Sequence, residues 1–215
     1  MILAAGLGKR MQPLTNTLPK PLLPINGKAL IEYHIEALAK IGIKDIVINV
    51  SHLANVLMEQ IGDGHHYGVN FHYSFEDHPL ETGGGIFQAL PILGDEPFIA
   101  VSADIFTDFD FSRLLNLPID MAHLVLTDNP SFHPEGDFAL DGNRVLNSGE
   151  PMFNFAGISV LSPALFADCQ PGQFSLSPLL RNAIDKQQVT GEYFNGMWYN
   201  IGTTAIYQAV MDAVE

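Results

Sequence analysis

Residues 29–50 read ALIEYHIEALAKIGIKDIVINV and place a helical pattern directly before a strand pattern. In the first part, five apolar residues recur at the spacing of one helical face: Leu30, Ile31, Ile35, Leu38 and Ile41. Gly42 then supplies a natural C-terminal stop for this helix. The following residues 45–50 form a mostly apolar run of strand length, which indicates a buried strand. A helix followed at once by a buried strand is typical of α/β proteins.

The same alternation continues on both sides of this pair. Strand patterns occupy residues 1–5, 70–75 and 97–102, and a helix pattern occupies residues 54–61. A loop over residues 81–85, with the glycine cluster 83–85, leads into a short helix that ends at residue 90. Because strands and helices alternate through short connections, we expect a Rossmann-like α/β fold with a mostly parallel central sheet and helices on both faces. The second half carries further strand and turn signals at 121–127, 137–140, 155–161 and 189–194, before a last helix near 203–214. A single domain over residues 1–215, with a small β lobe on the substrate side, is therefore predicted.

The composition is that of an ordinary globular protein. Of its 215 residues, 47% are hydrophobic and 16% are charged. The longest apolar runs, such as 98–101 and 155–161, are far too short to cross a bilayer, and no basic segment with a following apolar stretch indicates a signal peptide. Cys169 is the only cysteine, which excludes an internal disulfide and fits a reducing compartment. We expect a cytoplasmic protein without a membrane partner.

The distribution of charge points to a small anionic ligand. The net charge of −14 argues against nucleic acid as a partner, because binding to its backbone needs a cationic face. The first 44 residues nevertheless hold six of the ten basic residues and only two acidic ones, which makes this segment +4 and the remaining chain −18. An acidic protein with one cationic corner suits a small polyanion held at a focused site.

A glycine-rich segment lies within this cationic corner. Residues 3–24 read LAAGLGKRMQPLTNTLPKPLLP. The small residues Ala4, Ala5, Gly6 and Gly8 let the backbone approach a ligand closely and present N–H groups to an anion. Two cations accompany them, Arg10 with its planar fork and Lys20 with a compact charge between two prolines. The segment predicts a phosphate-binding loop.

Two familiar phosphate-binding motifs do not fit this loop. A dinucleotide fingerprint needs a glycine three positions after Gly8, where the chain has Met11. A Walker A loop needs four residues between its glycines and then Gly-Lys-Ser or Gly-Lys-Thr, which the chain lacks. The string LAAGLGKRMQPLT followed by PKPLLP instead closely resembles the signature of sugar-1-phosphate nucleotidyltransferases. The resemblance implies that Gly6 and Gly8 wrap a triphosphate, that Arg10 contacts the leaving pyrophosphate, and that Lys20 binds a substrate phosphate.

The same resemblance implies a Mg²⁺ site. Its first candidate ligand is Asp104 in VSADIF, directly after the predicted strand 97–102, where the family carries an N-G-D triplet and this chain has Ser102-Ala103-Asp104. The family's second carboxylate lies in a W-x-D-[IV]-G-T string, and this chain has Asn200 at the aspartate position of WYNIGT. An amide oxygen can coordinate Mg²⁺, but it contributes a dipole instead of a full charge. We expect weaker metal binding than an aspartate would give.

Longer stretches point to the two substrates. LETGGGI at residues 80–86 has Thr82 and Gly83, which by resemblance flank the nucleobase together with Ala5 and Gly6; the alternative is that these glycines start a helix. The strings LETGGGIFQALPILGD, HLVLTDNPSFHPEGDF and FNFAGISVL resemble N-acetylmuramate α-1-phosphate uridylyltransferases of bacterial cell-wall recycling. The resemblance implies a nucleotide-binding half over about 1–110 and a sugar-binding half over about 111–215. Sugar contacts are expected from Glu150, Asn154 and Gly157, each of which also reads as a plain turn or strand residue.

The expected reaction transfers a uridylyl group from UTP to a sugar 1-phosphate and releases pyrophosphate. The attacking phosphate oxygen is already anionic, so that positioning and charge stabilisation carry the catalysis. Two alternatives stay open. One is a guanylyl- or thymidylyltransferase for another hexose 1-phosphate, and the other is a sugar-nucleotide-binding relative of low activity, which Asn200 makes conceivable. The sequence leaves the oligomeric state undecided.

Overall fold

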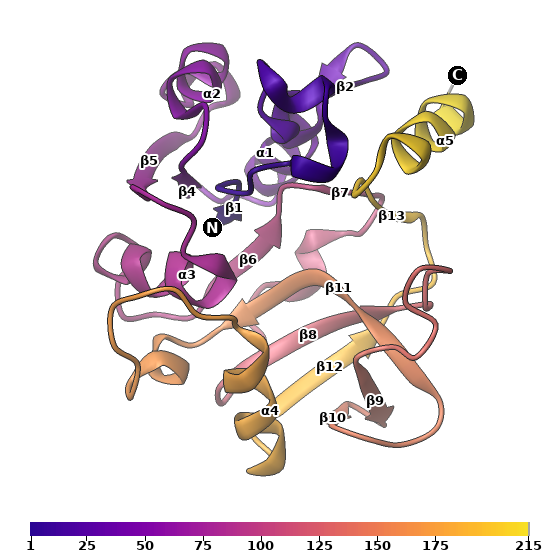
Figure 1. Ribbon diagram of the computed structural model, residues 1–215. Coiled ribbons are helices and arrows are strands. Elements are labelled where there is room, and N and C mark those ends of the chain that lie inside the picture. Colours follow the sequence, from indigo (N-terminus) through magenta and orange to yellow (C-terminus); the bar gives the residue numbers. More distant parts are fainter. Residues whose placement is uncertain (215) are drawn as a thin grey trace.

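The computed structural model describes residues 1–214, which build a central sheet of nine strands flanked by helices (Figure 1). The strands follow the order β5 (Asn70–Phe75), β4 (Asp45–Val50), β1 (Ile2–Leu3), β6 (Phe98–Ser102), β11 (Met152–Leu161), β8 (Ala122–Thr127), β12 (Val189–Tyr193), β10 (Arg144–Leu146) and β9 (Phe138–Asp141). The helices are α1 (Leu30–Lys40), α2 (Ala54–Ile61), α3 (Glu81–Leu93), α4 (Ser177–Asp185) and α5 (Thr204–Val214). Two short ribbons lie apart from this sheet: β2 (Pro24–Ile25) with β3 (Lys28–Ala29), and β7 (Ile105–Thr107) with β13 (Trp198–Asn200).

The sheet changes character at its centre. From β5 through β4 and β1 to β6 every neighbouring pair is parallel, as predicted for the first half. Beyond β6, β11 runs antiparallel to both β6 and β8, and the β9–β10 hairpin closes the edge; only the β8–β12 pair is parallel among the described strands there. No helix lies between β8 and β11 in the chain; the β9–β10 hairpin and its loops join them, and an antiparallel pair needs no crossover helix. The expected mostly parallel sheet is thus confirmed for the first half, and the complete sheet is mixed.

Helices cover both faces of this sheet, as the alternation predicted. One buried cluster joins strand side chains to α1 and α2 through Ile31, Ile35, Leu57 and Ile61. The opposite cluster joins the sheet to α3 and α4 through Ile86, Ala89, Leu180 and Ile184. Along β4, Ile46 and Ile48 enter the first cluster and Val47 the second, as the period of a strand requires.

Helix α5 packs away from the main sheet. Its Val210 joins Met11, Leu23 and Ile25 in a third buried cluster, and the Tyr207 hydroxyl donates a hydrogen bond to the Pro24 carbonyl at 2.5 Å. The end of the chain therefore buttresses the glycine-rich segment at its beginning. Figure 1 shows α5 beside β2.

The glycine cluster 83–85 corrects one expectation. The predicted loop over residues 81–85 is the first part of α3, so the alternative of a helix start is the better interpretation. Glycine is a poor helix former, but here close packing requires it. A Cβ added to Gly83 would lie 2.6 Å from the Phe174 ring, and one added to Gly85 would lie 2.5 Å from Glu76 Oε1. Helix α4 and the β7–β13 ribbon were not predicted.

Candidate active site

The glycine-rich loop follows β1 directly and faces a cavity. The Ala4 N–H donates to Asn49 Oδ1 at 2.8 Å, which fixes the start of the loop against β4. Gly8 has a φ of +61°, which favours glycine, and a Cβ there would come within 3.0 Å of Thr15. The Thr15 hydroxyl donates to the Gly8 carbonyl at 2.8 Å and holds this turn. A Cβ added at Gly6, by contrast, meets no atom within 4 Å, so the backbone is open on the side where a ligand would approach.

Lys20 and Asp104, predicted to have separate roles, contact each other. Lys20 Nζ donates to Asp104 Oδ2 at 2.7 Å, although the two residues are 84 positions apart in the chain. The lysine side chain is 11% exposed and the carboxylate 34%. Asp104 follows β6, and the turn after it is held from behind by His34 of α1, whose Nε2 donates to the Ile105 carbonyl at 2.9 Å. Burial lowers the pKa of His34 to about 4, so its imidazole is neutral near pH 7.

The β7–β13 ribbon brings the second predicted metal ligand to the same place. Asn200 pairs with Ile105, and the Ile201 N–H donates to the Asp104 carbonyl at 2.8 Å. The Asn200 Oδ1 atom is buried and has no hydrogen-bond partner among the described residues. Arg10 approaches this ribbon too, since a Cβ added at Gly202 would lie 3.5 Å from Arg10 Nη2 and 3.3 Å from Asn200 Oδ1. The fold thus gathers the predicted cations and both predicted metal ligands.

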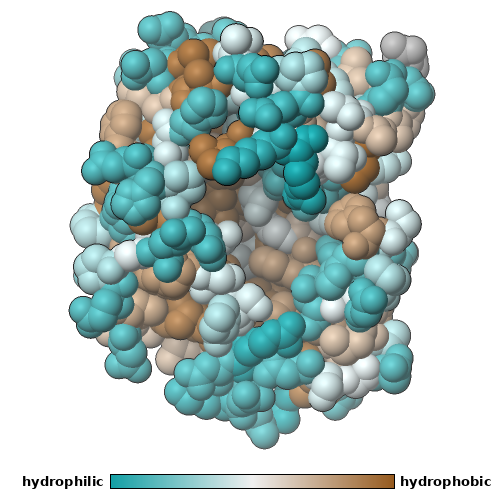
Figure 2. Space-filling view, in the orientation of Figure 1, coloured by the Kyte–Doolittle hydropathy of each residue, from teal (hydrophilic) through white to brown (hydrophobic). Residues whose placement is uncertain are grey.

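A cavity of about 480 Å³ is lined by Arg10, Lys20 and Asp104, whereas Asn200 lines a second, adjoining cavity. The lining of the first cavity includes most of the predicted nucleotide site: Ala4, Ala5, Gly6, Gly8, Arg10, Lys20, Thr82 and Asp104. Figure 2 shows a hollow in this face of the molecule, with a paler and partly apolar floor inside a hydrophilic rim. Gly83 is an exception, because it is buried behind Thr82 against Phe174 and lies outside the lining. Its position is set by helix packing, and the cavity lends no support to its prediction as a nucleotide contact.

Two polar lining residues of this cavity were missed. Asn49 and Glu76 are 3% and 5% exposed, and Asn49 Nδ2 donates to Glu76 Oε1 at 2.7 Å. Glu76 Oε2 accepts the Leu80 N–H at 2.9 Å, one residue before α3. Together with the Ala4 contact, this buried pair links the glycine-rich loop to the first turn of α3. A polar residue in the middle of DIVINV was the available sequence signal, since a buried amide needs partners.

A second cavity of about 270 Å³ adjoins the first and shares Leu3, Thr82 and Ser102 with it. Of the three predicted sugar contacts it includes Gly157, which has a φ of +74° at a bulge of β11 and packs on Ser102. Glu150 is exposed in the turn before β11, and Asn154 is buried with its Nδ2 donating to the Phe155 carbonyl at 2.9 Å. Neither lines this cavity, so the structure lends no support to these two predicted sugar contacts. Asp137, Phe155 and Trp198 line it instead.

Comparison with known proteins identifies the family of this chain. A family model described as nucleotidyl transferase matches residues 1–138. The chain belongs to the nucleotidyl transferase family. Within this family it is 42% identical to the N-acetylmuramate α-1-phosphate uridylyltransferase of Neisseria meningitidis serogroup B, over 94% of this chain and 92% of that protein. The protein of the same name from Caulobacter vibrioides is 30% identical over 94% of this chain and 90% of its own length.

Other nucleotidyl transferases show the breadth of the family. A D-glycero-α-D-manno-heptose 1-phosphate guanylyltransferase of Campylobacter jejuni is 30% identical over 96% of both chains. The structure of an inositol-1-phosphate CTP transferase from T. maritima superposes with a TM-score of 0.80 at 20% identity, covering 99% of this chain and 94% of that one. A UDP-glucose pyrophosphorylase complexed with UDP-glucose superposes with a TM-score of 0.79 at 19% identity, covering 99% and 96%. These two likenesses concern the fold.

Two features are absent from the described residues. None of the helices within residues 1–214 is both long and apolar enough to span a bilayer. Within the same residues, no three His, Cys, Asp or Glu side chains come together as a metal cluster.

Proposed function

We propose that this nucleotidyltransferase moves a uridylyl group from UTP to N-acetylmuramate 1-phosphate, giving the UDP-sugar and pyrophosphate in cell-wall recycling. The observation that carries the proposal is the 42% identity, over 94% of this chain, to a relative named for this activity. A UTP-consuming reaction and the lone Cys169 both suit the cytoplasm.

The first cavity suits the triphosphate. The Gly6–Gly8 backbone and the Arg10 guanidinium would hold the β- and γ-phosphates, because amides and a planar fork match phosphate oxygens. Lys20 would stabilise the charge that develops at the α-phosphate. The sugar phosphate would enter from the second cavity, and its anionic oxygen would attack the α-phosphorus in line while pyrophosphate leaves. The shared boundary at Thr82 and Ser102 is where the two substrates would meet.

The residues present fit a Mg²⁺ ion. This ion is commonly held by one or two protein oxygens together with substrate phosphates and water. Asp104 offers a carboxylate, and the neighbouring Asn200 offers a buried amide oxygen that lacks a partner among the described residues. When bound, Mg²⁺ would neutralise phosphate charge and orient the leaving group. These two side chains would hold it, and Lys20 would remain close enough to contact phosphate.

A matrix of substrates tests the proposal. Pyrophosphate release is measured with UTP, GTP, dTTP and CTP against N-acetylmuramate, N-acetylglucosamine, glucose and mannose 1-phosphates. We expect the highest kcat/KM for UTP with N-acetylmuramate 1-phosphate. A maximum with GTP would favour the guanylyltransferase alternative, which the Campylobacter jejuni relative supports. Binding of nucleotide without pyrophosphate release in any pairing would favour a sensor.

A further inference from the structure

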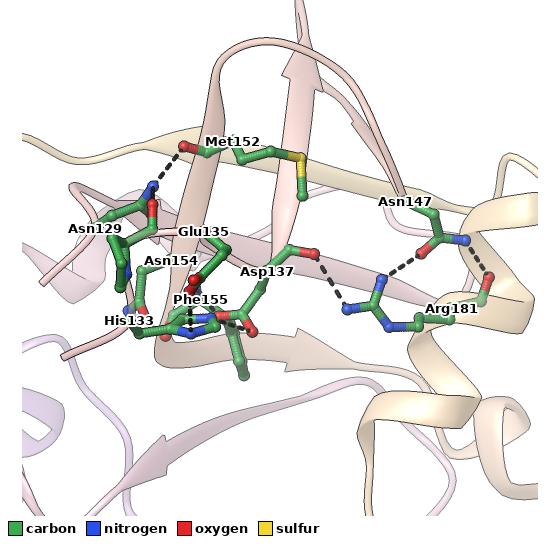
Figure 3. Close-up of polar contacts among 10 residues, drawn as sticks. Asn129, His133, Glu135, Asp137, Asn147, Met152, Asn154, Phe155 and Arg181 are labelled. Carbon is green, nitrogen blue, oxygen red and sulfur yellow. Dashed lines mark hydrogen bonds and ion pairs between the residues drawn. The ribbon is translucent and has the colours of Figure 1, made fainter.

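Asp137 holds a fixed carboxylate at the second cavity (Figure 3). Its Oδ2 accepts the Phe155 N–H at 2.8 Å, and its Oδ1 accepts a hydrogen bond from His133 Nε2 at 3.2 Å. Its backbone is tied as well, because the Asp137 N–H donates to the Phe153 carbonyl at 2.7 Å and Arg181 Nη2 donates to the Asp137 carbonyl at 3.2 Å. Contacts to side chain and backbone together fix the orientation of the carboxylate.

The groups around Asp137 are themselves fixed. Arg181 of α4 donates from Nη1 to Asn147 Oδ1 at 3.3 Å and lies over the Phe138 ring at 4.9 Å from its centre. On the other side, Asn129 Nδ2 donates to the Pro134 and Met152 carbonyls, both at 3.0 Å, and so closes the loop that precedes Asp137. Figure 3 shows Asp137 between Asn129 and His133 on one side and Arg181 with Asn147 on the other. Such support is what a preorganised binding group needs.

The carboxylate keeps acceptor capacity that the protein does not use. An ionised carboxylate offers about four acceptor positions, and the contacts above occupy two of them. The side chain is 33% exposed and belongs to the cavity wall. Asp137 is the one charged side chain among the described residues that line this cavity; beside it lie the apolar surfaces of Phe155 and Trp198 and the hydroxyl of Ser159. Mostly apolar walls with a few placed polar groups are typical of specific ligand sites.

We infer that Asp137 is a specificity-determining residue that accepts a hydrogen bond from a hydroxyl or amide N–H of the sugar. The inference rests on the proposed function, which puts the sugar in the second cavity. A carboxylate has no proton to donate at neutral pH, so it selects donor groups and repels anionic ones. The sugar must therefore turn a hydroxyl or acetamido N–H toward Asp137. Its phosphate lies away from Asp137, at the boundary formed by Thr82 and Ser102.

The test separates this role from a structural one by measuring the two substrates independently. Asp137→Asn removes the charge, and Asp141→Asn is a matched control, because Asp141 is exposed at the end of β9 and outside the cavity lining. We expect Asp137→Asn to raise the KM for N-acetylmuramate 1-phosphate about 10- to 100-fold, the scale of a lost hydrogen bond to a charged group, while the KM for UTP changes less than about twofold. Asp141→Asn should leave both KM values within about twofold.

Sugar 1-phosphates that lack single hydroxyls, or that lack the acetamido group, identify the donor. One such analogue should bind the unaltered protein about tenfold or more weakly than its parent, and the same deletion should cost Asp137→Asn no more than about twofold. Equal rises in both KM values with a lowered Tm would overturn the inference, as would an unchanged KM for the sugar phosphate. If Asp137→Asn does not fold, the unaltered protein alone decides the question. The inference is then overturned if every analogue binds within about twofold of the affinity of its parent sugar phosphate.

The two proposals fail in different ways. If the unaltered protein releases no pyrophosphate from UTP with any sugar 1-phosphate, the proposed function fails. The role of Asp137 is then judged by calorimetry. The affinities of N-acetylglucosamine 1-phosphate and its deoxy analogues are measured for the unaltered protein, Asp137→Asn and Asp141→Asn. Loss of affinity in Asp137→Asn alone supports the inference, and equal affinity of both variants and the unaltered protein overturns it.

Discussion

The parallel and antiparallel halves of the sheet build their cavities in different ways. In the parallel half, the ends of neighbouring strands supply the groups: Ala4 follows β1, Asn49 lies near the end of β4, and Asp104 follows β6. In the antiparallel half, Asp137 precedes the edge hairpin, Gly157 sits in a bulge, and Trp198 comes from a separate ribbon. Parallel strands bring their carboxyl ends to one edge by topology alone. The antiparallel half depends on side-chain contacts that hold loops in place.

The largest effect should come from Lys20 and Arg10, the two cations of the parallel half that we propose bind phosphate. We expect Lys20→Ala to lower kcat/KM about 10²-fold, the scale of a lost preorganised charge, because the lysine is nearly buried beside Asp104. Arg10→Ala should lower kcat/KM by a similar factor, because Arg10 is proposed to hold the phosphates that leave as pyrophosphate. Lys28→Ala is the matched control, since Lys28 pairs with Glu36 at an exposed site outside both cavities. Initial rates of pyrophosphate release measure the effect. A folded Lys20→Ala protein with unchanged rates would show that the cation serves only the fold.

Removing the buried pair of Asn49 and Glu76 should have a smaller effect on catalysis. It should change binding at the first cavity, proposed for the nucleotide, more than binding at the second. Asn49→Ala leaves the Ala4 N–H and the Glu76 carboxylate without their shared partner. We expect a loss of about 1–3 kcal/mol in the free energy of unfolding, the cost of buried polar groups left unpaired. The KM for the nucleotide should rise more than that for the sugar phosphate.

Urea denaturation and the two KM values measure these consequences. Asn70→Ala serves as the control for Asn49→Ala, because Asn70 is exposed on β5 and its side-chain amide donates to Asp45 on the surface. Equal rises in both KM values would erase the distinction between the two halves, because the pair would then support the whole cleft.

The smallest effect concerns the junction of the halves at Asn200. Asn200→Asp replaces an amide dipole by a full negative charge beside Asp104 and should tighten Mg²⁺ binding several-fold, about 1 kcal/mol for such a charge in a solvated cleft. Calorimetric titration with Mg²⁺ measures this without turnover. Asn195→Asp, at an exposed position before β13, controls for charge alone. Identical Mg²⁺ affinities in all three proteins would remove position 200 from the metal site.

Local patterns predicted much of the parallel half. Strands 45–50 and 70–75 and helix 54–61 have the expected boundaries, because their burial follows the periodicity of the chain. Lys20 and Asp104 were found through motif and strand-end position, but their contact across 84 residues was not, since no local pattern encodes it. The start of α3 was misplaced because glycine disfavours helices except where a neighbour, here Phe174, needs the space of a side chain.

The antiparallel half was less predictable for a physical reason. Glu150 and Asn154 were chosen by resemblance, yet the turn and the sheet direct them away from the cavity. Asp137 lies in the segment HPEGDF, where an aspartate reads as a turn residue. Its place in the wall depends on Phe155, His133 and Arg181, which come from three different segments. Only the assembled fold reveals that arrangement.

The ion pair of Lys20 and Asp104 has a consequence for which ligands the cleft admits. Lys20 and Asp104 lie 2.7 Å apart and already neutralise each other. A charged ligand that binds one of them therefore gains only the difference between its own attraction and the attraction that it displaces. A free anion would bind Lys20 and leave the Asp104 carboxylate without its counter-ion, and a free cation would bind Asp104 and leave Lys20 unpaired. A chelate of a divalent cation with a nucleotide carries both signs at once and satisfies both ions in a single exchange. If this cleft binds a nucleotide as proposed, the pair would favour metal–nucleotide complexes over their separate components.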